Sequence, residues 1–326
     1  MSYFPGSDAL FLFVYISTFV TGLPMNIMAL CTLIKKFRQG VVPVDVLLIN
    51  LTISDLLLLI FLPFRMLEAA SDMQWNMPYV LCPLSAYMYF CSIYISSLSL
   101  MAISVERYLA VAFPIKYKLV QKPIYPVLAS LFIWIIGSVH CSIVLIVEHT
   151  IPSNMTEQNN TMCYSTFSPA QLEVLLPVRL EVSIVLYFIP FLITVFCYSN
   201  FIKIVLSQTR LQKKRRIRAI CLVVITLINF ILCFMPYNLS HVVGFFQGNS
   251  PQWRVYALLL STFNASLDPL IFYFSSASFQ KVFLEGLVHV FEKVAFSTCS
   301  CSCGKCCDAI CIAPCERETK GTIFSV

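Results

Sequence analysis

Hydrophobic residues occur along this chain in long, nearly unbroken windows, and short polar segments separate them. A bilayer core requires about 20 apolar residues for each helix that crosses it. Seven windows reach that length, at approximately residues 9–34, 45–67, 80–106, 124–147, 177–206, 217–245 and 253–275. The pattern predicts an all-α membrane protein, a seven-transmembrane helix bundle over residues 9–276 that a short segment at 1–8 precedes.

The composition agrees, since 59% of the residues are hydrophobic, 12% are charged and the mean hydropathy is +0.82, which excludes an ordinary soluble domain. The net charge of +6 does not indicate a nucleic-acid partner, because the basic residues lie at the ends of spans. They gather at Lys35, Lys36, Arg38, Lys116, Lys118, Lys122, Lys203, Arg210, Lys213, Lys214, Arg215, Arg216 and Arg218. By the positive-inside rule these segments are cytoplasmic, which predicts a plasma-membrane protein with an extracellular N-terminus.

The segment between the fourth and fifth spans, residues 148–176, is then extracellular. It contains no Lys or Arg and carries two glycosylation acceptors, Asn154 and Asn159. Among the cysteines in or between the spans, Cys82 and Cys163 alone lie outside the bilayer core on the oxidising side. We therefore predict a disulfide between them, the alternative being two unpaired thiols.

Beyond the seventh span, Phe279, Val282, Phe283 and Leu287 form an apolar stripe that predicts a short cytoplasmic amphipathic helix at residues 277–290. Seven cysteines crowd the remaining tail at 291–326: Cys299, Cys301, Cys303, Cys306, Cys307, Cys311 and Cys315. Because no histidine accompanies them, reversible palmitoylation is favoured over a zinc site.

Several polar residues fall inside the predicted spans, where each is costly. Asp55 lies in the middle of the second span and Asp268 deep in the seventh; Asn26, Ser96 and Asn264 share that depth. These five side chains predict a polar cluster between helices. The cluster either holds a cation such as sodium or forms a hydrogen-bonded packing network, and the sequence favours neither.

Only three of the 22 Lys and Arg residues fall on the outer side: Arg65, Arg179 and Arg254. Arg179 precedes Pro190 by 11 residues, about 16 Å along a helix, and so projects from the outer third of the fifth span. His241 and Tyr237 share a helix face one turn apart. A pocket for a small anion between the arginines is one interpretation; ion pairs with acids such as Glu68, Glu148, Glu173 and Glu181 are the other.

The spans carry Gly-Leu-Pro-Met-Asn, Leu-Thr-Ile-Ser-Asp-Leu, Glu-Arg-Tyr, Trp134, Pro190 with Tyr198, Cys-Phe-Met-Pro and Asp-Pro-Leu-Ile-Phe in order. In these motifs the chain resembles the rhodopsin-like (class A) G-protein-coupled receptors. The resemblance implies a cytoplasmic switch of Glu106, Arg107, Tyr108 and Tyr198, in which Arg107 leaves its acidic neighbour to contact a heterotrimeric G protein. The chain departs from the family at Phe234, where Trp is usual, and at Phe272, where Tyr is usual.

Further motifs at residues 177–181, 236–241, 253–254 and 264–270 resemble the free fatty acid receptors, above all the short-chain members. The resemblance implies acetate, propionate and butyrate as ligands, no enzymatic activity and no cofactor besides the possible sodium ion. It implies Gi/o first and Gq second as G-protein partners, with arrestin and membrane lipid as further partners. It assigns ligand binding to Arg179, Arg254, His241, Tyr237, Tyr94, His140 and Leu145.

Two residues weaken the correspondence with the short-chain receptors. Leu145 stands where a short-chain member has isoleucine, and Ser165 where a mammalian one has an acidic loop residue. A different anionic ligand, such as a longer fatty acid, a hydroxy acid or a nucleotide, remains an alternative. A carboxylate transporter is another, but the sequence shows no inverted repeat.

Overall fold

The structure, a computed structural model, describes residues 7–40, 42–78, 80–120, 122–151, 163, 167–208, 212–275 and 280. Several predictions fall outside these residues. They concern glycosylation at Asn154 and Asn159, Ser165, the cysteine-rich tail and, apart from Gln280, the amphipathic helix at 277–290.

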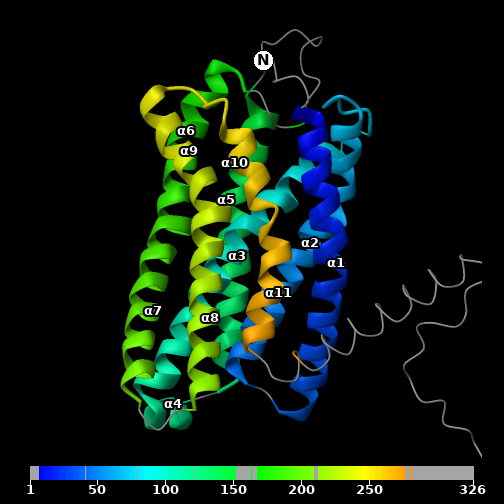
Figure 1. The fold of residues 1–326 in the computed structure, drawn as a ribbon. Coiled ribbons are helices and arrows are strands. Elements are labelled where there is room, and N and C mark those ends of the chain that lie inside the picture. The colour runs from blue at the N-terminus through cyan, green and yellow to red at the C-terminus, as the bar shows by residue number, and fades with distance from the viewer. Residues whose placement is uncertain are drawn as a thin grey trace, which may run out of the picture. The chain divides into compact units, whose positions relative to one another are not determined.

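Within the described residues, seven segments are long and apolar enough to cross a membrane, as predicted. The helices are α1 (Ser7–Gln39), α2 (Pro43–Ala70), α3 (Leu81–Ala112), α4 (Pro114–Val120), α5 (Ile124–Thr150), α6 (Pro169–Ser183), η2 (Ile184–Phe188), α7 (Ile189–Ser207), α8 (Lys213–Asn229), η3 (Phe230–Phe234), α9 (Met235–Gln247), α10 (Arg254–Ser261) and α11 (Asn264–Ser275). They run alongside one another as a bundle (Figure 1), in which α3 packs against α2, α5 and α7. The all-α, seven-transmembrane fold is confirmed.

Prolines shape the interrupted spans. Pro190 lacks an N–H for the carbonyl four residues earlier, and the helix widens there into the π-turn η2. The carbonyl of Leu186, which Pro190 leaves without its usual donor, accepts a hydrogen bond from Ser97 of α3 at 3.1 Å. Pro236 follows the second π-turn, η3, in the same way. These turns place the outer halves of the fifth and sixth spans, α6 and α9, around the functional site.

The fifth span begins earlier than predicted, at Pro169 rather than near residue 177. The reason is a capping box: Ser168 accepts from the amide of Gln171, and the Gln171 side chain accepts from the amide of Ser168. Pro177 therefore lies inside α6. The short helix α4, which the hydrophobic windows did not indicate, lies at the lower end of the bundle in Figure 1.

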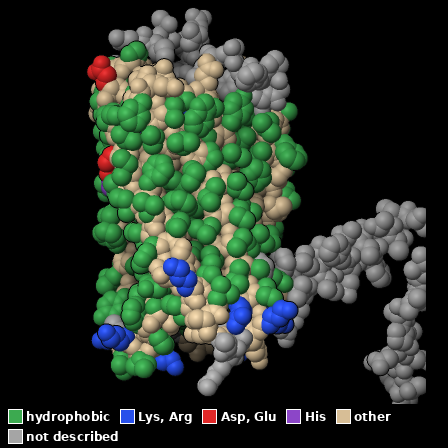
Figure 2. Space-filling model, turned by 60° about the vertical axis from the view of Figure 1, so that its left-hand side comes forward, with side chains coloured by type: hydrophobic (Ala, Val, Ile, Leu, Met, Phe, Trp, Pro, Cys, Tyr) green, Lys and Arg blue, Asp and Glu red, His purple; other side chains and the backbone are tan. Residues whose placement is uncertain are grey.

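The outside of the bundle is apolar. Figure 2 shows a face covered by hydrophobic side chains, with Lys and Arg gathered toward its lower part. Phe13, Leu192 and Phe196 are each more than 60% exposed, as lipid-facing side chains are expected to be. On this face positive charge thus concentrates toward the end that the sequence predicts to be cytoplasmic.

Candidate anion-binding site

A small cavity of about 30 Å³ lies between α3, α5, α6 and α9. Its lining residues, which define the Arg179 cavity, are Phe90, Tyr94, His140, Cys141, Val144, Val178, Arg179, Val182, Tyr237 and His241. Five of the seven residues predicted to bind ligand are among them. Leu145 is not, because the adjacent residue Val144 faces the cavity in its place.

Arg179 is the cationic wall of this cavity. Its side chain is only 7% exposed, it donates to the Ser250 hydroxyl at 2.9 Å, and its guanidinium lies 4.7 Å from the Phe167 ring centroid. Glu181, which we considered as an ion-pair partner, instead lies 3.2 Å from His140. No carboxylate in the described part of the chain forms an ion pair with Arg179. A buried cation without a counter-ion is what an anion site requires.

The opposite wall combines an imidazole with two phenols. His241 and Tyr237 lie one turn apart on α9 with ring centroids 4.4 Å apart, which confirms their shared face. His241 is 3% exposed, and its Nδ1 has no hydrogen-bond partner among the described residues. Tyr94 is buried beside them. The cavity therefore offers a guanidinium, an imidazole and two hydroxyls to one small polar ligand.

Arg254 begins α10, as predicted, but it lines a neighbouring cavity. This second space of about 40 Å³, the Arg65 cavity, is bounded by Phe11, Tyr15, Arg65, Glu68, Met73, Tyr89, Phe90, Cys163, Arg254, Val255 and Leu258. Phe90 and Tyr237, stacked with centroids 6.3 Å apart, stand between the two spaces. Because the Arg254 guanidinium also interacts with Tyr237, it reaches the edge of the Arg179 cavity without lining it.

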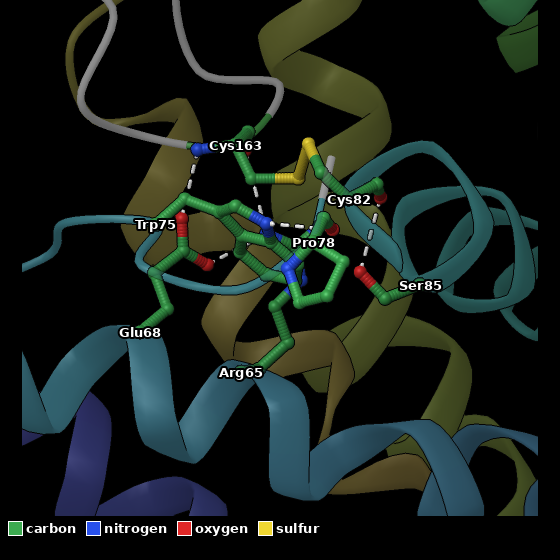
Figure 3. Close-up of a disulfide and its surroundings, with 7 residues drawn as sticks. All are labelled: Arg65, Glu68, Trp75, Pro78, Cys82, Ser85 and Cys163. Atoms are coloured by element: carbon green, nitrogen blue, oxygen red, sulfur yellow. Dashed lines mark hydrogen bonds and ion pairs between the residues drawn. A yellow bond between two sulfur atoms is a disulfide. The ribbon is translucent and has the colours of Figure 1, made fainter. Parts of the chain in front are cut away.

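At the end of the bundle opposite α4, Cys163 lies beside Arg65 and Glu68 of α2 (Figure 3). Cys82 and Cys163 form the predicted disulfide. Glu68 accepts from the Cys163 amide at 2.8 Å, while Arg65 donates to Glu68 at 2.8 Å and to the Cys163 carbonyl at 3.3 Å. Arg65 therefore belongs to an ion pair, one of the two interpretations of the outer cations, and this pair binds Cys163 to α2.

A second polar cluster lies deeper, between α2, α3, α8 and α11. Asp55 accepts from Ser96 at 3.5 Å and from Asn264 at 3.2 Å, and Asp268 accepts from Asn229 at 2.6 Å. Asn229, which the sequence interpretation missed, also donates to Asn264 at 2.7 Å. The sequence feature that could have identified Asn229 is an amide side chain inside an otherwise apolar span.

For Asn26 the contacts agree with the packing network, one of the two interpretations of these polar residues. Asn26 donates to the carbonyl of Ala265 at 2.7 Å, the group that Pro269 leaves without its usual donor four residues later. It therefore secures α1 against α11. In the cluster itself, Asn264 and Asn229 link Asp55 to Asp268, and the Oδ2 atom of each aspartate has no hydrogen-bond partner among the described residues.

At the basic end of the bundle, Glu106 accepts a hydrogen bond from Tyr117 of α4. No ion pair joins it to Arg107 in the part of the chain that the structure describes. Burial and this hydrogen bond raise the pKa of Tyr117, so its hydroxyl stays a donor at neutral pH. Tyr198 is buried and lies 3.5 Å from Thr226, and Tyr108 packs edge-on against Phe113 and Phe196.

Comparison with known proteins agrees with this architecture. The model of the 7 transmembrane receptor (rhodopsin family) matches residues 25–272. Free fatty acid receptor 3 of Rattus norvegicus is 49% identical over 282 residues, 86% of this chain and 88% of its own. Free fatty acid receptor 2 of the same species is 50% identical over 286 residues, 86% of both chains. Free fatty acid receptor 1 of Mesocricetus auratus is 31% identical over 83% of this chain and 93% of its own. The chain thus belongs to the free fatty acid receptors of the rhodopsin family, and is a multi-pass G-protein-coupled receptor of the plasma membrane rather than an enzyme.

Proposed function

We propose that this receptor is activated by extracellular short-chain carboxylates, such as acetate, propionate and butyrate. The observation that carries the proposal is Arg179, a 93% buried guanidinium (7% exposed) that faces a small cavity and has no carboxylate partner among the described residues. A ligand carboxylate would supply the missing charge in a bidentate ion pair. The names of the similar receptors, free fatty acid receptors 2 and 3, support the same class of ligand.

Cavity size favours the shortest acids. A buried water molecule needs roughly 10–15 Å³ of cavity volume, so the 30 Å³ of the Arg179 cavity corresponds to about two or three water molecules. An acid of five or six heavy atoms, at a ceiling of about 1.5 kcal/mol per atom, binds no tighter than roughly micromolar. The receptor would accordingly report abundant metabolites rather than trace signals.

In the bound state we propose that Arg179 pairs with the carboxylate, with His241, Tyr237 and Tyr94 completing its hydrogen bonds. Arg254, from the edge at Tyr237, would contribute its charge through a small side-chain rotation. His140 and Val144 would contact the alkyl end. Leu145 would support Val144 without touching the ligand.

The orientation of the chain in the membrane determines which end of the bundle contacts the G protein. We propose an extracellular N-terminus, because the loops rich in Lys and Arg then lie in the cytoplasm. The partners would be heterotrimeric G proteins, Gi/o first and Gq second, with arrestin after activation. Glu106, Arg107 and Tyr198 would form the switch at the cytoplasmic end, since Arg107 is already free of a Glu106 ion pair among the described residues. Tyr108, packed between aromatic rings, would support that switch.

We also propose that a sodium ion binds between Asp55 and Asp268. A shared proton or cation stabilises two buried carboxylates linked by the same amides, and each here has an oxygen without a partner among the described residues. Asn264 and Ser96 would complete an all-oxygen set of ligands, which suits a hard cation.

The decisive test applies acetate, propionate, butyrate, longer acids and nucleotides to cells that express the chain, and records G-protein activation. Arg179→Ala should weaken propionate at least about 100-fold, because a desolvated carboxylate then loses a buried partner worth roughly 3 kcal/mol. Arg179→Lys keeps the charge but lacks the planar guanidinium, so its propionate potency should lie between those of the parent and Arg179→Ala. Unchanged propionate potency in surface-expressed Arg179→Ala contradicts the proposal. Carboxylate uptake without a G-protein response would indicate a transporter instead.

Arg254→Ala and the double variant show whether both arginines hold one carboxylate. If they do, the double variant should lose less free energy of binding than the sum of the single losses. Additive losses would place Arg254 in a separate role in the Arg65 cavity.

A further inference from the structure

A groove far larger than either outer cavity lies at the opposite end of the bundle. It encloses about 580 Å³ between α2, α3, α4 and the first turns of α5. Its lining residues, which define the α4 groove, are Pro43, Leu47, Met101, Ala102, Val105, Glu106, Leu109, Phe113, Lys116, Tyr117, Lys122, Tyr125, Pro126 and Ala129. The carboxylate site described above does not use this space.

The groove is apolar along its length and basic at its α4 side. Lys116 and Lys122 are exposed, and neither ammonium group has an ion-pair or hydrogen-bond partner among the described residues. The single acid in the lining, Glu106, is engaged by Tyr117. The groove therefore combines an apolar channel with two available ammonium groups, the complement of an anionic amphiphile.

Its position identifies the source of that amphiphile. Side chains around it, including Leu109, Phe113 and Tyr125, are more than a third exposed on the face where a bilayer must lie. The end of the bundle that carries α4 is the basic one (Figures 1 and 2). On the orientation proposed above this end meets the cytoplasmic leaflet, which is rich in anionic phospholipid.

We propose that the α4 groove is a binding site for an anionic phospholipid, with one acyl chain in the apolar channel and the phosphate held by Lys116 and Lys122. The volume lies within the range of about 300–1,000 Å³ that is usual for specific small-molecule sites. The bound chain would lie against Glu106 and Tyr117, the pair at the cytoplasmic switch. Lipid composition would thereby alter G-protein activation from inside the membrane.

The test uses the full-length receptor in nanodiscs of phosphatidylcholine with or without phosphatidylserine, with no carboxylate added. Native mass spectrometry counts retained lipids, and a photoactivatable phosphatidylserine maps the contact. Because no agonist is present and both leaflets are equivalent, a wrong ligand or orientation in the proposed function leaves this test intact. The parent should retain phosphatidylserine over phosphatidylcholine, with crosslinks in α3, α4 and α5.

Two variants separate the headgroup from the chain. Lys116→Gln with Lys122→Gln should weaken phosphatidylserine retention about 30-fold, roughly fivefold for each lysine near an anionic surface. Lys118→Gln, an exposed lysine of the same helix outside the lining, is the matched control and should change retention little. Ala129→Trp should fill the channel and remove the crosslinks, whereas Leu131→Trp, on the outer face of α5, should not.

Three results would overturn the proposal. They are equal retention of phosphatidylcholine and phosphatidylserine, a loss in Lys118→Gln as large as that in the double variant, and unchanged crosslinking in Ala129→Trp. Retention of an added long-chain fatty acid in place of phospholipid would also overturn it, since the groove would then serve a different occupant.

Discussion

Val182 limits the length of the ligand's alkyl chain if the Arg179 cavity is the binding site. It lies on α6 three residues after Arg179, is 6% exposed and lines the cavity. Replacing it with alanine enlarges the space beside the proposed carboxylate position and leaves every polar group in place. We therefore predict that Val182→Ala shifts the preference from acetate and propionate toward pentanoate and hexanoate.

The expected size follows from the atoms removed. The substitution deletes two methyl carbons, which makes room for about two methylene groups of a ligand. Each buried methylene contributes about 0.8 kcal/mol, so the potency of pentanoate relative to acetate should rise roughly fourfold per methylene and about 15-fold at most. Truncating one buried valine also costs roughly 1–3 kcal/mol of stability, so surface expression must be measured alongside.

The assay is a set of concentration–response curves for the straight-chain acids from acetate to hexanoate, with G-protein activation as the readout. Ratios of potency within one variant cancel differences in expression. Val174→Ala is the matched control, because Val174 lies on the same helix, is 40% exposed and does not line the cavity. Its ratios should equal those of the parent.

Identical pentanoate-to-acetate ratios in Val182→Ala and the parent would refute the reasoning, provided that both respond to acetate. The alkyl chain would then extend elsewhere, for example past Phe90 into the Arg65 cavity.

Three further predictions concern other parts of the bundle. Tyr117→Phe should lower ligand-independent nucleotide exchange roughly five- to 30-fold, because the freed Glu106 can pair with the adjacent arginine; unchanged basal exchange would contradict this. Asp268→Asn should abolish sodium dependence of propionate potency, measured in sodium chloride against potassium chloride, and a variant as sodium-sensitive as the parent would exclude the proposed ion site. Glu68→Gln should destabilise the purified receptor by about 1–3 kcal/mol, seen as a lower Tm, because Arg65 and the Cys163 amide lose a charged acceptor; an unchanged Tm would show that the disulfide alone holds Cys163 in place.

The helices could be predicted from sequence because each window of apolar residues has one physical explanation, burial in lipid. Their ends were less predictable. The start of α6 depends on the reciprocal bonds of Ser168 and Gln171, which lie in a polar stretch before the apolar window. The short helix α4 carries too few residues to produce a window at all.

In the candidate site, too, some features could be predicted from the sequence and others could not. Arg179, Tyr237 and His241 could be placed together because helical periodicity fixes their depth and face. The separation of Arg254 from these residues could not be predicted, because it depends on Phe90 of α3 stacking on Tyr237 of α9. Contacts between side chains of different helices depend on how the helices pack, and one chain's residue spacing contains no information about that.

Polar groups at the two candidate sites differ from those that the helix packing itself satisfies. The Ser97 hydroxyl and the Asn26 Nδ2 group donate to carbonyls that prolines leave without a helical donor, so packing explains these two donors. His241 Nδ1 and the Oδ2 atoms of Asp55 and Asp268 have no such partner among the described residues. A buried polar atom left unpaired costs about 1–3 kcal/mol, which a bound ligand at either of these two depths would offset. The outer depth also holds the guanidinium of Arg179 and suits an anion, whereas the inner one presents carboxylate oxygens and suits a cation, so the two candidate ligands of this receptor have opposite charge.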